Sequence, residues 1–176
     1  MTNLSEVTGK RWNAFEFKNR KLKLGDGNYP NKTLKHLAYL LKGQSITSNG
    51  IEKGDYPVIA GGQISPYTCN RYNFKGNVIT ISASGAYSGY VWYHNYPIFA
   101  SDCTVVFSKE ESEITTLYLS EILKLKQKEI YNLQQGAGQP HVYARDLEKI
   151  NIPILPIEKQ KDITNKITAI REEAKK

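Results

Sequence analysis

The side chains between residues 56 and 96 are suited to reading the edges of nucleic-acid bases. Seven of the 12 tyrosines lie in this stretch, interleaved with amide and basic side chains. Asn, Gln and Arg make paired hydrogen bonds to base edges, while a tyrosine buries its ring and keeps its hydroxyl wet. Glycine-rich turns would present such side chains on a rigid scaffold. We expect base reading by Gln63, Asn70, Arg71, Ser84 and Tyr87. The alternative for any one tyrosine is a place in the core of a small β domain.

A second polar loop, residues 135–141, offers similar chemistry. Gly138 would let the backbone approach a ligand closely, because glycine carries no side chain. The amide of Gln139 has the donor and the acceptor that match the N6 and N7 edge of adenine. His141 could hold a phosphate or a base edge, so both residues are candidate base readers. The alternative is a connection whose glycines serve only the turn, with His141 packed on the end of a helix.

Basic residues predict an anionic partner, with nucleic acid first and a membrane surface second. The net charge is +7, and residues 1–35 contribute +5 of it, from eight Lys and Arg against three acidic residues. A positive surface attracts phosphates regardless of base sequence. The expected phosphate contacts are Lys21, Lys23, Lys42 and Lys75. A solvated leader is the alternative reading of the N-terminal segment.

Catalytic and metal-binding patterns are not apparent in the sequence. Ser84, His94 and Asp102 could be imagined as a hydrolase triad, but no G-x-S-x-G turn accompanies the serine. Phosphate-binding, dinucleotide-binding and methyl-transfer motifs are missing as well. Cys69 and Cys103 lie far apart in a chain with three histidines, so neither a zinc site nor a disulfide framework is predicted. We therefore expect a non-enzymatic chain without a metal or cofactor.

The elements that must position these side chains are, in the first part of the chain, one short helix and four strands of an α+β domain. Thr33 is placed to cap a helix that runs through Leu41 and ends at Gly43. Short runs of β-branched and aromatic residues between glycines predict strands. These strands are expected at 56–60, 77–81, 90–93 and 103–107. The sequence has neither an apolar run long enough to span a membrane nor a signal peptide, which predicts a cytoplasmic protein.

Helical spacing governs the second half of the chain. Apolar residues predict one long helix over about 112–134, with Ser108 and Glu111 spaced as a capping box ahead of it and Gly136 placed to stop it. One helical turn and a short strand are expected within 146–154.

A narrow apolar stripe marks the last part of the chain, from Glu158 to Lys176. Ile163, Ile167, Ile170 and Ala174 are spaced 4, 3 and 4 apart, as in the seam of a coiled coil. Two heptads are too short to be stable alone. We expect Ile163, Ile167 and Ile170 to pack on a second helix, from another copy or from chain beyond this sequence. The alternative is a terminal helix folded on its own domain.

The order of these pieces resembles the target recognition domain of type I restriction-modification specificity subunits. The matching pieces are Leu41-Lys42-Gly43, residues 54–62 (GDYPVIAGG), residues 78–89 (VITISASGAYSG), residues 100–103 (ASDC), the helix from Thr116, residues 136–140 (GAGQP) and residues 147–163 (LEKINIPILPIEKQKDI). The last piece is the most specific, because the family ends each recognition domain with a Pro-rich strand, Glu-x-Gln or Glu-Gln, and a long helix. Here Lys159 stands between Glu158 and Gln160, and the resemblance covers about 34–163.

The resemblance implies a fold, a function and partners. The fold would be a single mixed-sheet α+β recognition domain with a long packing helix and the start of a C-terminal coiled-coil spacer helix. The basic N-terminal segment would cover 1–32, the DNA recognition domain 33–156, and the spacer or dimerisation helix 157–176. The chain would read one half of a bipartite double-stranded DNA site. A second recognition domain or second copy would pair through the C-terminal helix.

Partner subunits would supply the catalysis in such a system. A modification (methyltransferase) subunit would methylate adenine and a restriction subunit would cleave DNA, while the specificity component itself carries no active site. The alternative reading is the DNA-recognition domain of a fused restriction endonuclease and methyltransferase. A basic module for RNA or polysaccharide is a third reading, which the ordered pieces argue against.

Overall fold

The computed structural model describes residues 29–47 and 50–175 of the chain. Lys21 and Lys23, with almost all of the basic segment expected over 1–32, lie outside the described residues. Within the described part no helix is long and apolar enough to cross a membrane.

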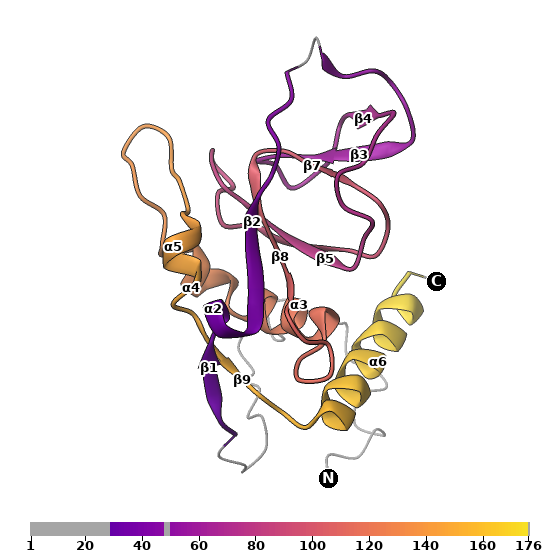
Figure 1. Ribbon diagram of the computed structural model, residues 1–176, viewed down its shortest axis with the longest axis vertical. Coiled ribbons are helices and arrows are strands. Elements are labelled where there is room, and N and C mark those ends of the chain that lie inside the picture. The colour runs from indigo at the N-terminus through magenta and orange to yellow at the C-terminus, as the bar shows by residue number, and fades with distance from the viewer. Residues whose placement is uncertain (1–28, 48–49, 176) are drawn as a thin grey trace.

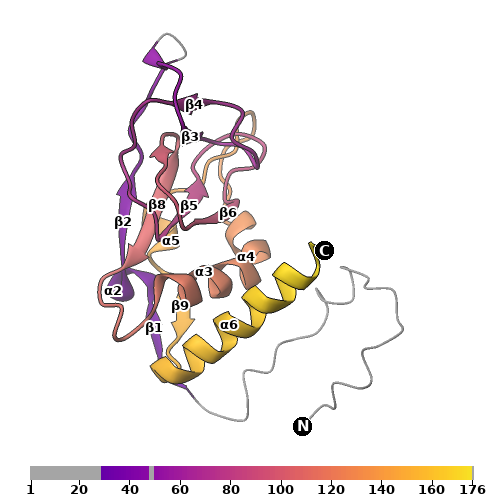
Figure 2. The same ribbon diagram turned by 90° about the vertical axis from the view of Figure 1, so that its right-hand side faces the viewer.

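A four-stranded antiparallel sheet forms the centre of the fold (Figures 1 and 2). Its strands, in spatial order, are β2 (Ala38–Lys42), β8 (Cys103–Ser108), β5 (Val78–Ser82) and β6 (Val91–His94). All five residues of β5 are buried, because both faces of the sheet are covered. Ile79 and Ile81 point into the main core with helix α3 (Thr116–Leu125), whereas Val78 contributes to a second cluster with Ile59 and Ile98. The four predicted strands are confirmed as β3 (Tyr56–Ile59), β5, β6 and β8.

Two smaller sheets complete the β structure. In the first, β3 (Tyr56–Ile59) pairs antiparallel with β4 (Thr68–Cys69) and parallel with β7 (Phe99–Ala100). In the second, β1 (Asn31–Thr33) pairs antiparallel with β9 (Asn151–Pro153). Parallel and antiparallel pairs therefore occur together, and the mixed α+β fold is confirmed.

The helix expected from Thr33 to Leu41 is wrong beyond its first turn. Helix α2 covers only Leu34–Leu37, and the chain then becomes strand β2. Its partner is β8, with Ala38 opposite Ser108 and Leu41 opposite Val105. Residues of good helix propensity extend here because pairing with a distant strand satisfies their backbone groups, which the local sequence does not reveal.

The helix expected over 112–134 is shorter and broken. Helix α3 spans Thr116–Leu125, and α4 spans Gln127–Tyr131, with Lys126 leaving helical geometry between them (φ −87°, ψ 12°). Thr115 caps α3, since its hydroxyl accepts from the amide of Tyr118 at 3.1 Å. Glu111 does serve this helix start, because its carboxylate accepts from the amide of Thr116. The capping box expected with Ser108 is replaced by this pairing.

The helical turn, the strand and the terminal helix predicted for the last part of the chain are present, although the turn begins two residues earlier than expected. A helical turn, α5 (Ala144–Leu147), leads to β9, and α6 (Ile157–Glu173) follows. Helix α6 lies beside α3 at the end of the domain away from β3 and β4, and its C-terminal end stands clear of the sheets (Figures 1 and 2).

Candidate nucleic-acid interface

One end of the central sheet gathers the candidate loops. Thr104 pairs with Lys42 on one side and Ile81 on the other, and Ile81 in turn pairs with Val91. Only the pair Ser82 and Cys103 lies beyond this row, so the loop that follows β5 begins next to it. Lys42, which is exposed, therefore lies at the same end as Ser84 and Tyr87.

Two loops meet at this end and form one unit, which we call the loop pair: residues 83–89 and 135–142. The amide of Gly85 donates to the carbonyl of Pro140 at 3.0 Å, and the amide of Val142 donates to the carbonyl of Ala83 at 3.0 Å. Gln135 and His141 exchange two backbone hydrogen bonds that close the second loop. Figure 1 shows this loop as the orange hairpin that rises between α4 and α5. Two segments far apart in the sequence are thus held in fixed register.

Ser84 joins the loop pair to two further segments. Its hydroxyl donates to the carboxylate of Asp102. Gly61 approaches so closely that a Cβ there would lie 2.7 Å from the carbonyl oxygen of Ser84. Because the hydroxyl hydrogen is engaged, base reading by Ser84 would have to use the oxygen lone pairs.

Gln63 and Tyr87 lie around Tyr131, at the end of α4. Burial raises the pKa of the Tyr131 hydroxyl, a hydrogen bond with Gln63 opposes that effect, and Tyr90 and Tyr87 raise the pKa further. Gln63 and Tyr87 are both exposed, as is Gln139 in the second loop. The structure therefore brings Gln63, Tyr87, Gln139 and His141 to one region of the surface.

Asn70 and Arg71 make their contacts elsewhere. The amide of Asn70 donates to the carboxylate of Glu52 at 2.6 Å, and the guanidinium of Arg71 lies 5.6 Å from the centre of the Phe99 ring. Both residues are exposed beside the three-stranded sheet. Lys75, also exposed, precedes β5 and so lies at the other end of that strand from Ser84.

Tyr143 and Arg145 are candidates that the sequence interpretation missed. The rings of His141 and Tyr143 stack, with centroids 6.1 Å apart and planes 18° apart, and the Arg145 guanidinium lies 4.8 Å from the centre of the Tyr143 ring. Val142 between them is buried. The alternation of His141, Val142 and Tyr143 was the available signal, since alternate side chains of an extended segment share one face. The Arg145 side chain is 72% exposed.

The imagined triad does not assemble. His94 pairs with Val78 at the end of β5 away from Ser84, and its Nε2 lies 2.9 Å from the hydroxyl of buried Thr80. Burial, with the charge of Lys124, lowers the pKa of His94 to about 4. Across residues 29–47 and 50–175 no group of three or more His, Cys, Asp and Glu side chains is arranged to hold a metal ion.

The apolar stripe of α6 is divided between the domain and solvent. Ile163 packs against the main core, Ile167 is half-buried, and Ile170 is 45% exposed. The helix therefore folds on its own domain at its start and exposes apolar surface toward its end.

A family model described as the type I restriction modification DNA specificity domain matches residues 27–176. The chain belongs to this family. The resemblance inferred from the sequence is thereby confirmed. Because the matched relatives are described as specificity subunits, the reading as part of a fused enzyme is not favoured.

Two curated relatives match this chain over different numbers of residues. The putative type I specificity subunit S.MpnORF285P of Mycoplasma pneumoniae is 25% identical over 153 residues, which are 81% of this chain and 49% of that protein. The MjaVIII specificity subunit of Methanocaldococcus jannaschii is 34% identical over 88 residues, 49% of this chain and 20% of that protein. The chain spans about half the length of the first relative.

Solved specificity subunits share the fold. The S subunit from M. genitalium superposes with a TM-score of 0.77 at 24% identity, over 86% of this chain and 41% of that chain. The HsdS subunit from Thermoanaerobacter tengcongensis gives a TM-score of 0.62 at 19% identity, over 88% and 40% of the two chains.

Proposed function

We propose that this chain reads one half of a bipartite double-stranded DNA site as the specificity component, or half of it, of a type I restriction-modification system. The loop pair carries the proposal. It is a rigid platform of backbone hydrogen bonds at one end of the central sheet, and it presents exposed amide, aromatic and basic side chains in a family that is described by its DNA specificity.

The proposed base readers are centred on this platform. They are Gln63, Tyr87, Gln139 and His141, with Ser84 through its lone pairs and with Tyr143 and Arg145 added from the structure. Asn70 and Arg71 would read from the neighbouring three-stranded sheet. Phosphate contacts are proposed for Lys21, Lys23, Lys42 and Lys75.

The chain would act without catalysis of its own and without a cofactor. A modification subunit would methylate adenine and a restriction subunit would cleave, both in the cytoplasm and at the site that the recognition domain selects. We retain 1–32, 33–156 and 157–176 as the basic segment, the recognition domain and the start of the spacer helix. Ile163, Ile167 and Ile170 would pair with the helix of a second recognition domain or second copy.

Selection of duplexes from a randomised pool, followed by titration at several salt concentrations, tests the proposal. We expect a short preferred sequence. The logarithm of the binding constant should fall with the logarithm of salt concentration by about 0.9 per neutralised phosphate.

Single lysine variants sharpen this test. Lys42→Ala and Lys75→Ala should each lower that slope by about 1 on every duplex, whereas Lys161→Ala on α6 should not. Enrichment of no sequence, or a preference for single-stranded RNA, would contradict duplex reading. Binding to a polysaccharide that hardly responds to salt would instead favour a basic module that binds polysaccharide.

A further inference from the structure

Polar contacts hold α6 to the recognition domain near both ends of the helix. Gln160 lies in its first turn and Arg171 in its last, a separation of about 16 Å along the helix axis. Both contact α3 or the segment that leads into it. Two separated attachment points define a direction as well as a position.

Gln160 provides the first attachment. Its side chain is completely buried, and its amide makes three hydrogen bonds. The oxygen accepts from the amide of Thr115 at 3.0 Å, and the nitrogen donates to the carbonyls of Glu113 at 2.9 Å and Leu155 at 2.8 Å. Since Thr115 also caps α3, one side chain ties the start of α6 to the start of α3. The glutamine of the Pro-rich segment therefore has a definite structural role.

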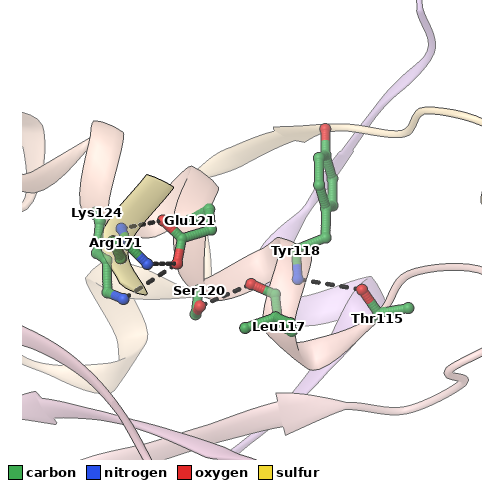
Figure 3. A network of polar contacts seen from close by, with 7 residues as sticks. All are labelled: Thr115, Leu117, Tyr118, Ser120, Glu121, Lys124 and Arg171. Atoms are coloured by element: carbon green, nitrogen blue, oxygen red, sulfur yellow. Dashed lines mark hydrogen bonds and ion pairs between the residues drawn. The ribbon is translucent and has the colours of Figure 1, made fainter. Parts of the chain in front are cut away.

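Arg171 provides the second attachment (Figure 3). Its two terminal nitrogens each lie 2.7 Å from one carboxylate oxygen of Glu121, so the pair is bidentate. Lys124 adds a contact to the same carboxylate at 3.2 Å. The Glu121 side chain is only 8% exposed. Burial raises the pKa of Glu121, but the bonds and charges of Arg171 and Lys124 outweigh it and leave that pKa below its ordinary value.

The middle of the helix is held less specifically. Buried Thr164 donates its hydroxyl back to carbonyls of α6 itself, namely those of Gln160 and Lys161. Ile163 packs against the main core, and Ile167 is half-buried. Apolar side chains tolerate small rotations and slides, whereas a bidentate ion pair and a buried amide require one geometry.

We propose that Gln160 and the Glu121–Arg171 pair are positioning residues that fix the direction of α6 relative to the loop pair. The consequence for DNA rests on the proposed function: the separation of two half-sites would depend on this clamp as well as on the length of the helices. The clamp itself is a property of the chain and can be tested without DNA.

Distance measurements between two spin labels on the intact chain test the clamp. Exposed Glu172 on α6 and Lys128 on α4 would be replaced by cysteine and labelled. Buried Cys69 and Cys103 remain in place, and the unsubstituted chain controls for their labelling.

A single narrow distance between the two labels is expected, and Arg171→Met should broaden and shift this distance. Arg171→Lys keeps the positive charge but cannot make the bidentate contact, so it should restore the narrow distance only in part. Lys166→Met removes a cation from an exposed pair on the same helix and should leave it narrow.

Gln160→Met extends the test to the first attachment. Combined with Arg171→Met, it should abolish the narrow distance while the near-ultraviolet circular dichroism of the sheet domain persists. If the double variant fails to fold, Arg171→Met alone decides. A distance that stays narrow and unshifted in folded Arg171→Met would overturn the proposal. Affinity for a selected half-site duplex should be unchanged in this variant. If the wild-type chain selects no duplex, the proposed function fails while the distances still report on the clamp.

Discussion

Ser84 and His94 lie at opposite ends of β5, and each already has a polar partner. Ser84 donates to Asp102, and His94 contacts Thr80. A contact of this kind stabilises the scaffold, because a buried polar group that lacks a partner is costly. Gln139, in contrast, is exposed. Base reading is therefore expected first from exposed amides such as that of Gln139, with Ser84 contributing only its oxygen lone pairs.

His94 should make the fold sensitive to mild acid. Its pKa is lowered to about 4 in the folded chain, so between that value and the ordinary value near 6.5 the unfolded state binds a proton that the folded state does not. Stability is therefore lost as pH falls through this window, by up to ~3 kcal/mol. Urea unfolding at pH 4.5–8 measures this as a falling midpoint. In His94→Gln the urea midpoint should depend less on pH. If the midpoints of the two proteins fall in parallel with pH, His94 is not the group responsible.

Arg145 should contribute to sequence discrimination. Its guanidinium lies over Tyr143, which reduces the entropy that binding costs, and its side chain is exposed. Arg145→Ala should cost roughly 1–3 kcal/mol on the selected half-site and little on a scrambled duplex, and the same is expected of Arg71→Ala. Titration of both duplexes provides the measurement, with Lys149→Ala as an exposed neighbouring control. Equal losses on the two duplexes would assign that arginine to phosphate contact.

Loops are the elements that carry the proposed function, and backbone contacts among three separate segments hold them in place. The 83–89 loop contacts the 135–142 loop through main-chain hydrogen bonds, and Gly61 packs against the carbonyl of Ser84. A rigid platform loses little entropy on binding and therefore supports affinity from few contacts.

Two glycines of these loops should respond differently to alanine. A Cβ at Gly61 would lie 2.7 Å from the backbone oxygen of Ser84, whereas a Cβ at Gly138 would meet nothing within 4 Å. Gly61→Ala should therefore destabilise the domain by about 1–3 kcal/mol through overpacking. Gly138→Ala should melt like the wild type but bind duplex DNA more weakly, because it blocks the close approach of a ligand to the backbone. Thermal melts and half-site titrations separate the two effects. Unchanged binding in Gly138→Ala would mean that this glycine serves only the turn.

At the scale of the whole molecule, helix α6 packs on the sheet domain with one side and exposes apolar surface near its end. Gln160, Thr164 and Arg171 of α6 contact the domain or are buried against it, while Ile170 remains 45% exposed near the end of the helix. An exposed apolar side chain on its own is ordinary. Ile170 next to half-buried Ile167 continues a coiled-coil spacing, however, and so favours pairing at the scale of the assembly.

Sedimentation tests this pairing. We expect self-association of the chain, since a second copy supplies an equivalent helix, and Ile170→Asp should weaken it without lowering the melting temperature. Ile167→Asp should weaken association and also destabilise the monomer, because Ile167 is half-buried. Thr168→Asp, at an exposed position off the apolar stripe, is the control. If all four proteins are monomers at every concentration, pairing between two copies is excluded. The remaining partner for α6 would then be a helix from chain beyond this sequence.

Local sequence alone determined the elements whose pattern is complete within a few residues. Short runs of β-branched and aromatic residues specify β5, β6 and β8, and helical spacing after Pro156 specifies α6, because these signals arise from neighbouring side chains. The order of the motifs also identified the family. The polar and aromatic character of the loops could be predicted in the same way, although the arrangement of the loops could not.

Tertiary structure decided what depends on partners far along the chain. Strand β2 replaces a helical segment because β8, which follows much later in the sequence, supplies its hydrogen bonds. The grouping of Gly61, Ser84, Asp102 and His141 likewise depends on contacts between distant loops. The same holds for Gln160 and Arg171, whose side chains acquire their roles only when α3 lies beside α6. Such contacts form because they bury and satisfy groups that no neighbouring residue can reach, and for this reason no local pattern announces them.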